Sequence, residues 1–385
     1  MTKKNLSTIA VRGGIENDGQ YNAVVPPIYL SSTYAFEGFD QKGPYDYSRC
    51  GNPSRDILAN TLAELEQGEH GIVTATGTAA IHLVCQLLKP DDLLVVPHDC
   101  YGGSYRLFVN LAERGAFKLK VINQTNPAEL DEAFAAKPKV IWVETPSNPL
   151  LRITDVKNIS ARAKACGAYV AVDNTFLSPV FQQPLTLGAD IVVHSTTKYI
   201  NGHSDVVGGV VVTASKELGE ELAWWANCIG ITGSAFDSYL TLRGVRTLVP
   251  RMKQHQENSL LLVDVLNGHE AVDVVYHPSL PTHPGHDIAR EQQLGFGAML
   301  SFELKGGTDQ VIKFIDALHH FSLAESLGGV ESLVCHPATM THAAMDEAAQ
   351  LTAGIKQNLV RFSVGIEDGK ELATDVKQAL DSLLD

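Results

Sequence analysis

The sequence predicts an α/β protein with a mostly parallel sheet, followed by a smaller α+β domain. Continuous apolar segments alternate with helical patterns over residues 92–213, among them KVIWVE, AYVAVD and DIVVHS. Strands that are apolar along their whole length are typical of a parallel sheet that helices cover on both faces. After two expected helices around residues 215–266, the order changes to strand, helix and strand, with VDVVYH, AMLSFEL and NLVRFSVG. This change of order predicts the second domain.

The length of 385 residues favours two domains, because a single core seldom grows this large. We place an N-terminal arm at residues 1–45, the large domain at 46–248 and the small domain at 249–385. The arm is rich in Gly, Pro, Ser and Thr and has no sustained period, so we expect it to be extended. Because it has no core of its own, a partner subunit is expected to receive it.

A helix is expected directly after the arm. Asn52 can cap its N-terminus, and Pro53 suits the first helical position. Apolar residues from Ile57 to Leu65 recur on one face, and Gly68 should end the helix. The large domain is therefore expected to begin with a helix.

Charge and composition exclude several classes of function. A net charge of −14 argues against nucleic acid, which requires a basic face. No apolar run reaches the roughly 18 residues that cross a membrane, and the start MTKKNLSTIAVRGG lacks the apolar region of a signal peptide. We therefore expect a cytoplasmic protein with neither nucleic acid nor membrane as its partner.

Cysteines and histidines form no recognised disulfide or metal pattern. The six cysteines are scattered without a CxxC, and several lie in apolar stretches, so we expect reduced core residues in a reducing compartment. A catalytic thiol is the alternative, although no cysteine has an obvious local activator. The segment HPSLPTHPGH at residues 277–286 is broken by prolines, which predicts a loop rather than a metal site.

Two ionisable residues end neighbouring expected strands. Asp173 ends AYVAVD, and Lys198 follows the next strand in HSTTK. Parallel strands present their carboxyl ends at one edge of a sheet, where open α/β folds build ligand sites. Pyridoxal 5'-phosphate (PLP) requires a lysine amine for its Schiff base and an acid that keeps its ring nitrogen protonated. The pair therefore predicts a PLP site, with Lys198 bound to the cofactor and Asp173 facing the ring nitrogen.

The phosphate of this cofactor needs hydroxyl and N–H groups. Ser195 and Thr197 lie beside Lys198 and supply hydroxyls. Gly77 stands directly before the helical pattern TAAIHLVCQLL, and a helix N-terminus favours a phosphate. A glycine there can also be a plain helix start. Together with Ser195 and Thr197, it predicts the second half of a phosphate-binding cup.

Three further polar residues follow strands of the expected sheet. Tyr101, in CYGGSYRLF, can stack on the pyridine ring or simply anchor a turn. Asn148, in ETPSNP, can bond the cofactor's phenolic oxygen or serve as a turn residue before Pro149. Arg106, one turn into the next helix, can reach a substrate carboxylate or face solvent.

Arginines elsewhere in the chain offer two anion sites. Arg361 lies in the otherwise apolar strand NLVRFSVG, where an unpaired guanidinium is costly. The α-carboxylate of an amino acid is a natural bidentate partner, and a structural salt bridge is the alternative. Tyr47 and Arg49, in YDYSRCGNPSRD, can clamp a phosphate or be exposed loop residues.

Taken together, these motifs resemble the Cys/Met-metabolism family of PLP-dependent enzymes. The matching segments run through almost the whole chain in the family's order and include YSRCGNPSRD, TATGTAAIH, CYGGSYR, ETPSNP, HSTTKYINGHSD, AESLGGVESL and RFSVGIED. The resemblance implies a type I PLP-dependent transferase fold and a homotetramer built as a dimer of dimers. It also implies that Tyr47 and Arg49 reach the phosphate in the neighbouring subunit, so that the active sites are shared.

Within the family, LAWWANCIG, LRGVRTLVPRM and YHPSLP resemble the enzymes of methionine biosynthesis by transsulfuration. These join an O-acylhomoserine, with O-succinyl-L-homoserine favoured, and L-cysteine by γ-replacement into L-cystathionine and the free acid. Glu325 argues against a methionine γ-lyase or a β-lyase, but a cystathionine γ-lyase is an alternative. A PLP-fold binding protein without catalysis is a second alternative, which the retained Lys198, Asp173, Tyr101 and Arg361 disfavour.

The resemblance also implies roles for individual residues. Lys198, Tyr101 and Asp173 would be catalytic, and Thr78, where many relatives carry Met, would join the cofactor contacts. The expected substrate-binding residues are Arg361, Ser326, Glu325, Arg106, Asp46 and Asn148. By charge, Asp46 and Glu325 suit the amino group of cysteine. Because Lys198 would act as base and acid in turn, we expect burial and a nearby cation to bring its pKa near neutral.

Overall fold

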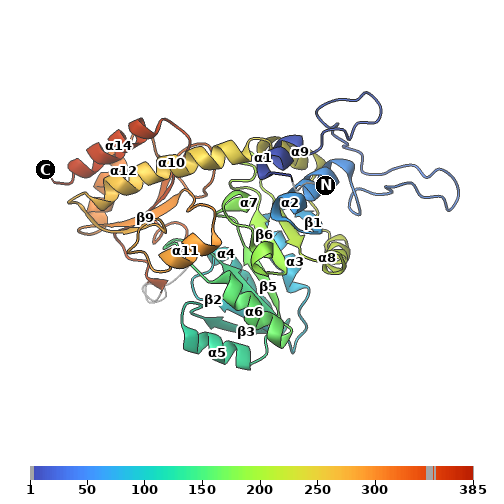
Figure 1. The fold of residues 1–385 in the computed structure, drawn as a ribbon, viewed down its shortest axis with the longest axis horizontal. Helices are drawn as coiled ribbons and strands as arrows, with labels where there is room; N and C mark the ends of the chain where they lie inside the picture. Colours follow the sequence, from blue (N-terminus) through green and yellow to red (C-terminus); the bar gives the residue numbers. More distant parts are fainter. Residues whose placement is uncertain (1–3, 344–349, 351–352, 385) are drawn as a thin grey trace.

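A computed structural model describes residues 4–343, 350 and 353–384. Two sheets lie in separate parts of the molecule, and the long helix α10 (Leu248–Asn267) runs along the part that holds the smaller one (Figure 1). The larger, 7-stranded sheet has the order β1-β7-β6-β5-β4-β2-β3. Its strands are β1 (His70–Thr74), β2 (Leu93–Pro97), β3 (Lys118–Ile122), β4 (Val140–Glu144), β5 (Tyr169–Asp173), β6 (Ile191–Ser195) and β7 (Gly209–Thr213).

The large sheet is mostly parallel, as predicted. Strands β3, β2, β4, β5 and β6 pair in parallel, whereas β7 is antiparallel to both β6 and β1. Alternate strand residues face two separate cores. One core is covered by α3 (Gly77–Cys85), α4 (Gly102–Glu113) and α8 (Lys216–Ile229). The other is covered by α5 (Pro127–Ala135) and α6 (Val156–Cys166).

The smaller, 5-stranded sheet has the order β10-β11-β12-β9-β8. Its strands are β8 (Val272–Tyr276), β9 (Met299–Leu304), β10 (Ser322–Leu323), β11 (Leu333–Cys335) and β12 (Leu359–Ser363). Helices α10 (Leu248–Asn267), α12 (Thr308–Ala317) and α14 (Gly369–Asp381) pack on it around Phe302, Phe314 and Phe362. The predicted change to strand, helix and strand is confirmed, although the short strands β10 and β11 were not predicted.

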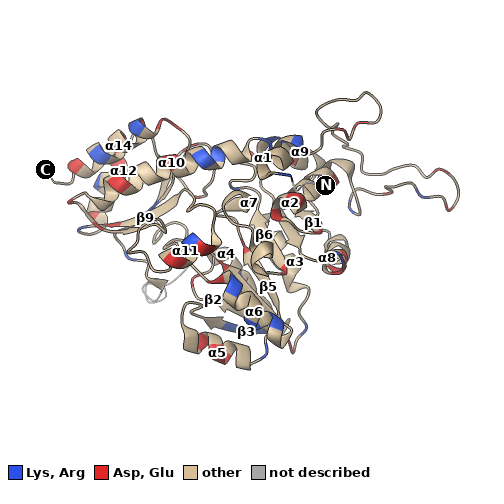
Figure 2. Ribbon diagram, viewed as in Figure 1, with Lys and Arg blue, Asp and Glu red and all other residues tan. Residues whose placement is uncertain are grey.

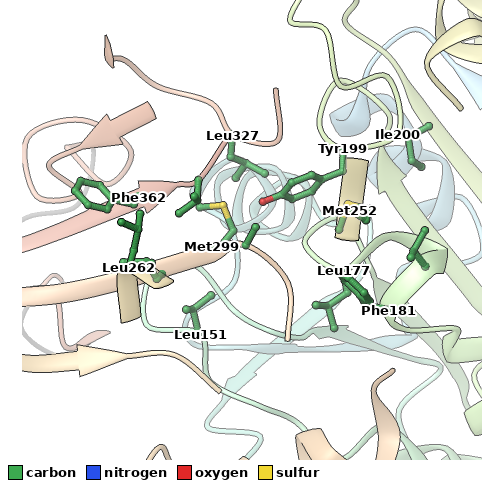
Figure 3. Close-up of a cluster of buried hydrophobic side chains, with 14 of the residues drawn as sticks. Leu151, Leu177, Phe181, Tyr199, Ile200, Met252, Leu262, Met299, Leu327 and Phe362 are labelled. Atoms are coloured by element: carbon green, nitrogen blue, oxygen red, sulfur yellow. The ribbon is translucent and has the colours of Figure 1, made fainter. Parts of the chain in front are cut away.

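One apolar core joins the two sheets directly behind the Lys198 segment. Tyr199 and Ile200, which follow this lysine, pack with Met252 of α10 and Met299 of β9 (Figure 3). Tyr199 is fully buried. The cluster fixes the position of the turn after β6 relative to the small sheet.

The helix α2 (Pro53–Glu66) begins as predicted, because the Asn52 side chain accepts the N–H groups of Ser54 and Arg55. Its end differs slightly. We expected Gly68 to end the helix, but the residue that ends it is Gln67, which takes the left-handed conformation with φ 60°. An amide side chain tolerates this region less well than glycine does, but the helix ends at the same turn.

Two expectations about the elements were wrong, and one strand was missed. The arm contains a helix, α1 (Leu6–Arg12), which packs against α2 and α10; its seven residues are too few to show a period. Residues 215–266 form three helices rather than two, because α9 (Ala235–Val245) lies between α8 and α10. Strand β1, at the edge of the large sheet, was not predicted. The remaining short helices are α7 (Ser178–Phe181), η1 (Pro184–Leu187) and α11 (His286–Gln292).

The cysteines divide into two groups. Cys85, Cys100 and Cys335 are buried, and burial raises the pKa of each thiol, as expected for core residues. Cys50, Cys166 and Cys228 are exposed, so the prediction of core positions is wrong for these three. All six are free.

The surface carries charges of both signs. Acidic and basic residues are interspersed on α11 and α14, whereas α6 carries basic residues alone (Figure 2). Among the residues that the structure describes, no helix combines the length and apolar character that a membrane span requires.

Candidate active site

Lys198 and Asp173 lie at the same edge of the large sheet, as predicted. Strands β5 and β6 pair in parallel, with Asp173 opposite Val193. Lys198 lies in the turn after β6, where its N–H donates to the Ser195 carbonyl at 3.3 Å. Both side chains therefore leave the carboxyl edge of the sheet, where a ligand can contact them together.

The Lys198 amine is held by the small domain. Its Nζ donates to Ser326 Oγ at 2.6 Å, and Ser326 takes the left-handed backbone conformation with φ 90°. Burial and the charge of Arg361 lower the pKa of Lys198 to about 8, against a smaller opposing effect of Glu325. Near neutral pH a substantial fraction of the amine is therefore unprotonated, which confirms the expected direction of the shift.

This pKa predicts how the apoenzyme captures the cofactor. An unprotonated amine is needed to attack an aldehyde, and its fraction rises as the pH passes through the pKa. The rate of PLP capture should therefore rise with pH around a midpoint near 8 rather than near 10.5. Stopped-flow absorbance of apoenzyme mixed with PLP would give this midpoint. A rate that still rises steeply above pH 9.5 would contradict the lowered pKa.

Asp173 is a carboxylate without a cationic partner. Its Oδ1 accepts the N–H of Thr175 at 3.0 Å, and Thr175 Oγ1 in turn accepts the N–H of Ser195 at 2.9 Å. Burial raises the pKa of Asp173, and the bonds from Thr175 partly oppose this rise. Among the described residues, no lysine or arginine forms an ion pair with it. A protonated ring nitrogen would supply the missing positive charge.

The N-terminus of α3 lies against Ser195. A Cβ on Gly77 would stand 2.8 Å from Ser195 Cβ, so any larger residue would push the helix away. The first N–H groups of a helix have no partner within it, and the Thr76 side chain accepts that of Ala79. The structure thus brings Gly77, Thr78 and Ser195 to one place that suits a phosphate.

Thr197 has a different arrangement. Its hydroxyl accepts the N–H of Gly208 at 3.0 Å and lies 3.3 Å from the Gly208 carbonyl. These bonds fix the loop before β7. The predicted contact with the phosphate therefore stays a prediction for this residue.

Tyr101 lies at the N-terminus of α4 with 45% of its surface exposed. Its N–H donates to Glu144 Oε2 at 2.7 Å, and its ring packs so closely over Gly103 that a Cβ there would lie 2.4 Å from it. Arg106, one turn further on, is exposed. It shares a surface pocket of about 360 Å³ with Thr78, which places it beside the expected phosphate cup.

Arg361 is buried in β12 with 3% of its surface exposed. Its Nη1 donates to Asn148 Oδ1 at 2.8 Å, and its Nη2 donates to the Ser326 carbonyl at 2.9 Å. Its Nε is buried and has no hydrogen-bond partner. Among the described residues no carboxylate pairs with it, so the alternative of a structural salt bridge is not observed. A carboxylate ligand would satisfy both the charge and the free Nε.

The predicted residues Asp46, Tyr47 and Arg49, which directly follow the arm, lie elsewhere. Arg49 donates to the backbone and side-chain oxygens of Asn227, both at 2.9 Å, and lies over the Tyr47 ring. Asp46 pairs with Lys42 at 2.8 Å. Tyr47 and Arg49 line a surface pocket of about 450 Å³ between the arm and the start of α9. Within the described part of one chain, none of the three contacts Lys198, and Glu325 is exposed near it.

Two residues were missed by the sequence analysis. Glu144 ends β4 in the same way that Asp173 ends β5, and the two are register partners. Its position at the end of KVIWVE was the available signal. Thr175 links Asp173 to β6, but a threonine two residues beyond a strand is too common to signal this role.

The site residues fit PLP. The reactive amine of Lys198, the unpaired carboxylate of Asp173 and the helix N-terminus beside Ser195 match the aldehyde, ring nitrogen and phosphate of that cofactor. The free Nε of Arg361 matches an amino-acid carboxylate.

Comparisons with known proteins agree with this chemistry. Cystathionine gamma-synthase of Escherichia coli K12 is 57% identical over 378 residues, which cover 98% of both chains. Cystathionine beta-lyase of Lactococcus lactis subsp. cremoris is 45% identical over 98% of this chain and 99% of its own. A crystal structure of cystathionine gamma synthase from Xanthomonas oryzae pv. oryzae in complex with cystathionine has 55% identity and a TM-score of 0.98, over 100% of this chain and 99% of that one. The model of the Cys/Met metabolism PLP-dependent enzymes matches residues 7–381, and the chain belongs to this family.

Proposed function

We propose that the protein is a PLP-dependent transferase that joins an O-acylhomoserine and L-cysteine into L-cystathionine by γ-replacement. The observation that carries this function is the 57% identity, over nearly the whole chain, to a cystathionine gamma-synthase. The bound cystathionine in the Xanthomonas relative, 55% identical, supports the same substrate class. The site agrees, because the Arg361 guanidinium has no carboxylate partner among the described residues and its free Nε suits an amino-acid carboxylate. The step belongs to methionine biosynthesis by transsulfuration.

The cofactor would be held by residues that follow different strands at the carboxyl edge of the large sheet. Lys198 would bind its aldehyde, Asp173 its ring nitrogen, and Tyr101 would stack on the ring. Asn148 would contact the phenolic oxygen. The phosphate would be held by Gly77, Thr78 and Ser195, with Thr197 nearby. Bound there, PLP supplies an electron sink for the carbon next to the substrate's amino group.

Arg361 would hold the substrate and Lys198 would move its protons. With the α-carboxylate on Arg361, Lys198 Nζ can remove the proton from Cα and pass it to the bound cofactor, after which the unprotonated Nζ can remove one from Cβ. The Cγ–O bond then breaks and the acyl group leaves as a carboxylate with the electron pair. The cysteine sulfur loses its proton and forms the Cγ–S bond, and Lys198 returns protons to Cβ and Cα. Ser326, which binds Nζ, can guide it between these positions.

Product analysis tests the function. The holoenzyme is incubated with O-succinyl-L-homoserine or O-acetyl-L-homoserine, with and without L-cysteine, and the products are identified by mass spectrometry. Cystathionine together with the free acid, formed when cysteine is present, supports the proposal. A protein that makes no cystathionine but cleaves added cystathionine is a lyase, and this result would overturn it.

We also propose that the protein is a homotetramer, a dimer of dimers with shared active sites. In the described part of one chain, neither Tyr47 nor Arg49 contacts Lys198, and the arm that precedes them projects from the body (Figure 1). The arm exposes large apolar side chains, including 99% of Phe39, 78% of Tyr21 and 71% of Leu30. Apolar surface of this extent is typical of a face that another subunit covers.

Mixing two inactive variants tests the shared site. Arg49→Ala keeps its Lys198, and Lys198→Ala keeps its Arg49, so one of the two sites in a hybrid dimer contains both residues. Random association at equal amounts should restore about a quarter of wild-type activity. Co-refolded mixtures would be assayed for cystathionine. In the control, Lys198→Ala is mixed with the variant that carries both Arg49→Ala and Lys198→Ala. This mixture should stay inactive, because it contains no Lys198. Hybrid dimers that form, as judged by differently tagged subunits, and lack activity would contradict shared sites.

Arg106 should distinguish the two esters by binding the distal carboxylate of the succinyl group. The succinyl ester brings a distal carboxylate, and attraction at an effective dielectric of about 20 is worth roughly 4 kcal/mol at 4 Å before desolvation. A quarter of this separates the esters about fivefold. Arg106→Ala should therefore lower kcat/KM for the succinyl ester about fivefold more than for the acetyl ester. Arg114→Ala, in the same pocket, is the matched control and should leave the ratio unchanged. Equal losses for both esters would show that Arg106 does not contact the acyl group.

A further inference from the structure

Glu144 is a buried carboxyl group at the active-site edge to which the mechanism assigns no step. It ends β4 with 6% of its surface exposed. Its register partner on the parallel strand β5 is Asp173. Two carboxyl groups thus stand at adjacent strand ends, beneath the position expected for the cofactor ring.

Glu144 lies against two loops that carry cofactor-facing residues. Its Oε2 accepts the N–H of Tyr101 at 2.7 Å. The backbone N–H of Asn148, in the loop after β4, lies close enough to Glu144 to stabilise its negative charge. Asn148 is itself buried and accepts Nη1 of Arg361 at 2.8 Å. One side chain therefore fixes the backbone on which the stacking tyrosine and the expected phenolic-oxygen ligand are placed.

The surroundings of Glu144 favour its neutral form. Asp173 and Asp99 both face it, as does the thiol of Cys100. Arg152, the nearby cation, is paired with Asp99 at 3.0 Å. In the described ranges, no lysine, arginine or histidine forms an ion pair with Glu144. Burial, followed by the charge of Asp173, raises the pKa of Glu144 well above its usual value.

Asp173 differs from Glu144 in ways that favour its ionised form. The side chain and backbone of Thr175 donate to it, and His194 lies near enough to stabilise its negative charge. His194 is itself paired with Glu66 at 2.5 Å. Two adjacent carboxyl groups with such different environments usually divide into one acid and one anion.

We propose that Glu144 is a positioning residue whose neutral carboxyl group holds Tyr101 and Asn148 in place around the cofactor, while Asp173 alone of the two provides the anion. The inference rests on the cofactor site of the proposed function. The test measures cofactor binding in the absence of substrate. The inference about Glu144 can therefore fail while the protein still forms cystathionine, and this outcome differs from a failure of the proposed function.

Cofactor titration of three variants tests the role. Apoenzymes of Glu144→Gln, Glu144→Asp and Glu144→Ala are titrated with PLP, and the Kd and the absorbance band of the bound cofactor are measured. Glu144→Gln, which has the same shape and no charge, should keep Kd within about threefold. Glu144→Ala leaves the Tyr101 N–H unpaired and removes the carboxyl group beside the Asn148 N–H, which should weaken binding about tenfold or more. Glu144→Asp shortens the side chain and should weaken binding similarly.

The pH dependence of the bound cofactor's absorbance separates charge from shape. If Glu144 is neutral, its replacement by glutamine leaves the midpoint of this pH titration unchanged. If it is ionised, the lost negative charge lowers the midpoint, because a nearby cation is then less stable. Glu303→Gln, a fully buried carboxyl in the small sheet, is the matched control and should alter neither Kd nor midpoint.

Three results would overturn the inference. Wild-type affinity in Glu144→Ala would exclude positioning, provided thermal unfolding shows that this variant is folded. If Glu144→Ala does not fold, the results for Glu144→Gln decide alone. In Glu144→Gln, a loss of affinity above tenfold, or a midpoint lowered by more than about one pH unit, would exclude a neutral carboxyl in this place.

Discussion

Replacing Lys198 with alanine should lower kcat by on the order of 10⁴-fold or more, because one amine both binds the cofactor and transfers the substrate's protons. The fold should survive. Lys198 lies in a turn, and its described contact through the amine is the single bond to Ser326. Neither the core around Tyr199 nor the pairing of β5 with β6 depends on that amine.

Chemical labelling identifies the lysine independently of turnover. Borohydride reduction of the holoenzyme followed by peptide mapping should place the cofactor label on Lys198. Lys164→Ala, an exposed lysine in α6, is the control and should keep both the label and the activity. A label on another lysine, or substantial turnover in Lys198→Ala with an unchanged far-ultraviolet spectrum, would refute the assignment.

The position of Lys198 and Asp173 could be predicted because it depends on local pattern and one general rule. Each follows a continuous apolar run, and parallel strands place their carboxyl ends together. The same rule located Tyr101 and Asn148. The position of a residue at the end of a strand therefore predicted the site better than its residue type did.

Contacts between distant segments could not be predicted in this way. Asn148 and Arg361 meet through packing of the small sheet against the large one, and no sequence period records that meeting. The contact of Lys198 with Ser326 is of the same kind. The apolar cluster behind Tyr199 makes both of these contacts possible, because it holds β9 and α10 against the turn after β6 (Figure 3).

The arm shows a second reason why structure could not be predicted fully from the sequence. Its composition predicted an extended segment, and the helix α1 was missed because seven residues span only about two turns. Tyr47 and Arg49 could be recognised as a phosphate clamp by type, but one chain leaves them away from Lys198. Their role therefore depends on association, which the hybrid-dimer experiment measures.

Replacing Asp173 with asparagine should weaken PLP binding and lower turnover together. In the site, the carboxylate pairs with a protonated ring nitrogen, and loss of one partner of a buried charged pair costs roughly 2–5 kcal/mol. This corresponds to a Kd raised about 30-fold to several thousand-fold. Asparagine keeps the shape and can still accept the Thr175 N–H, so the loss reports charge rather than packing.

The matched control is Asp190→Asn, at the opposite end of the same sheet. Asp190 also accepts a backbone N–H, that of Val170 at 2.8 Å, and burial likewise raises the pKa of its carboxyl. It lies at the amino edge, away from the expected ring, so its replacement should change Kd less than about twofold while costing similar stability. Apoenzyme titration and single-turnover rates for both variants, with Asp173→Glu as a charge-restoring variant, separate the two effects. If both asparagine variants lose affinity equally, or Asp173→Asn binds PLP normally, the carboxylate does not hold the ring nitrogen. If PLP affinity and turnover rate fall more in Asp173→Asn than in Asp190→Asn, and Asp173→Glu partly restores them, the negative charge at Asp173 is what keeps the ring nitrogen protonated.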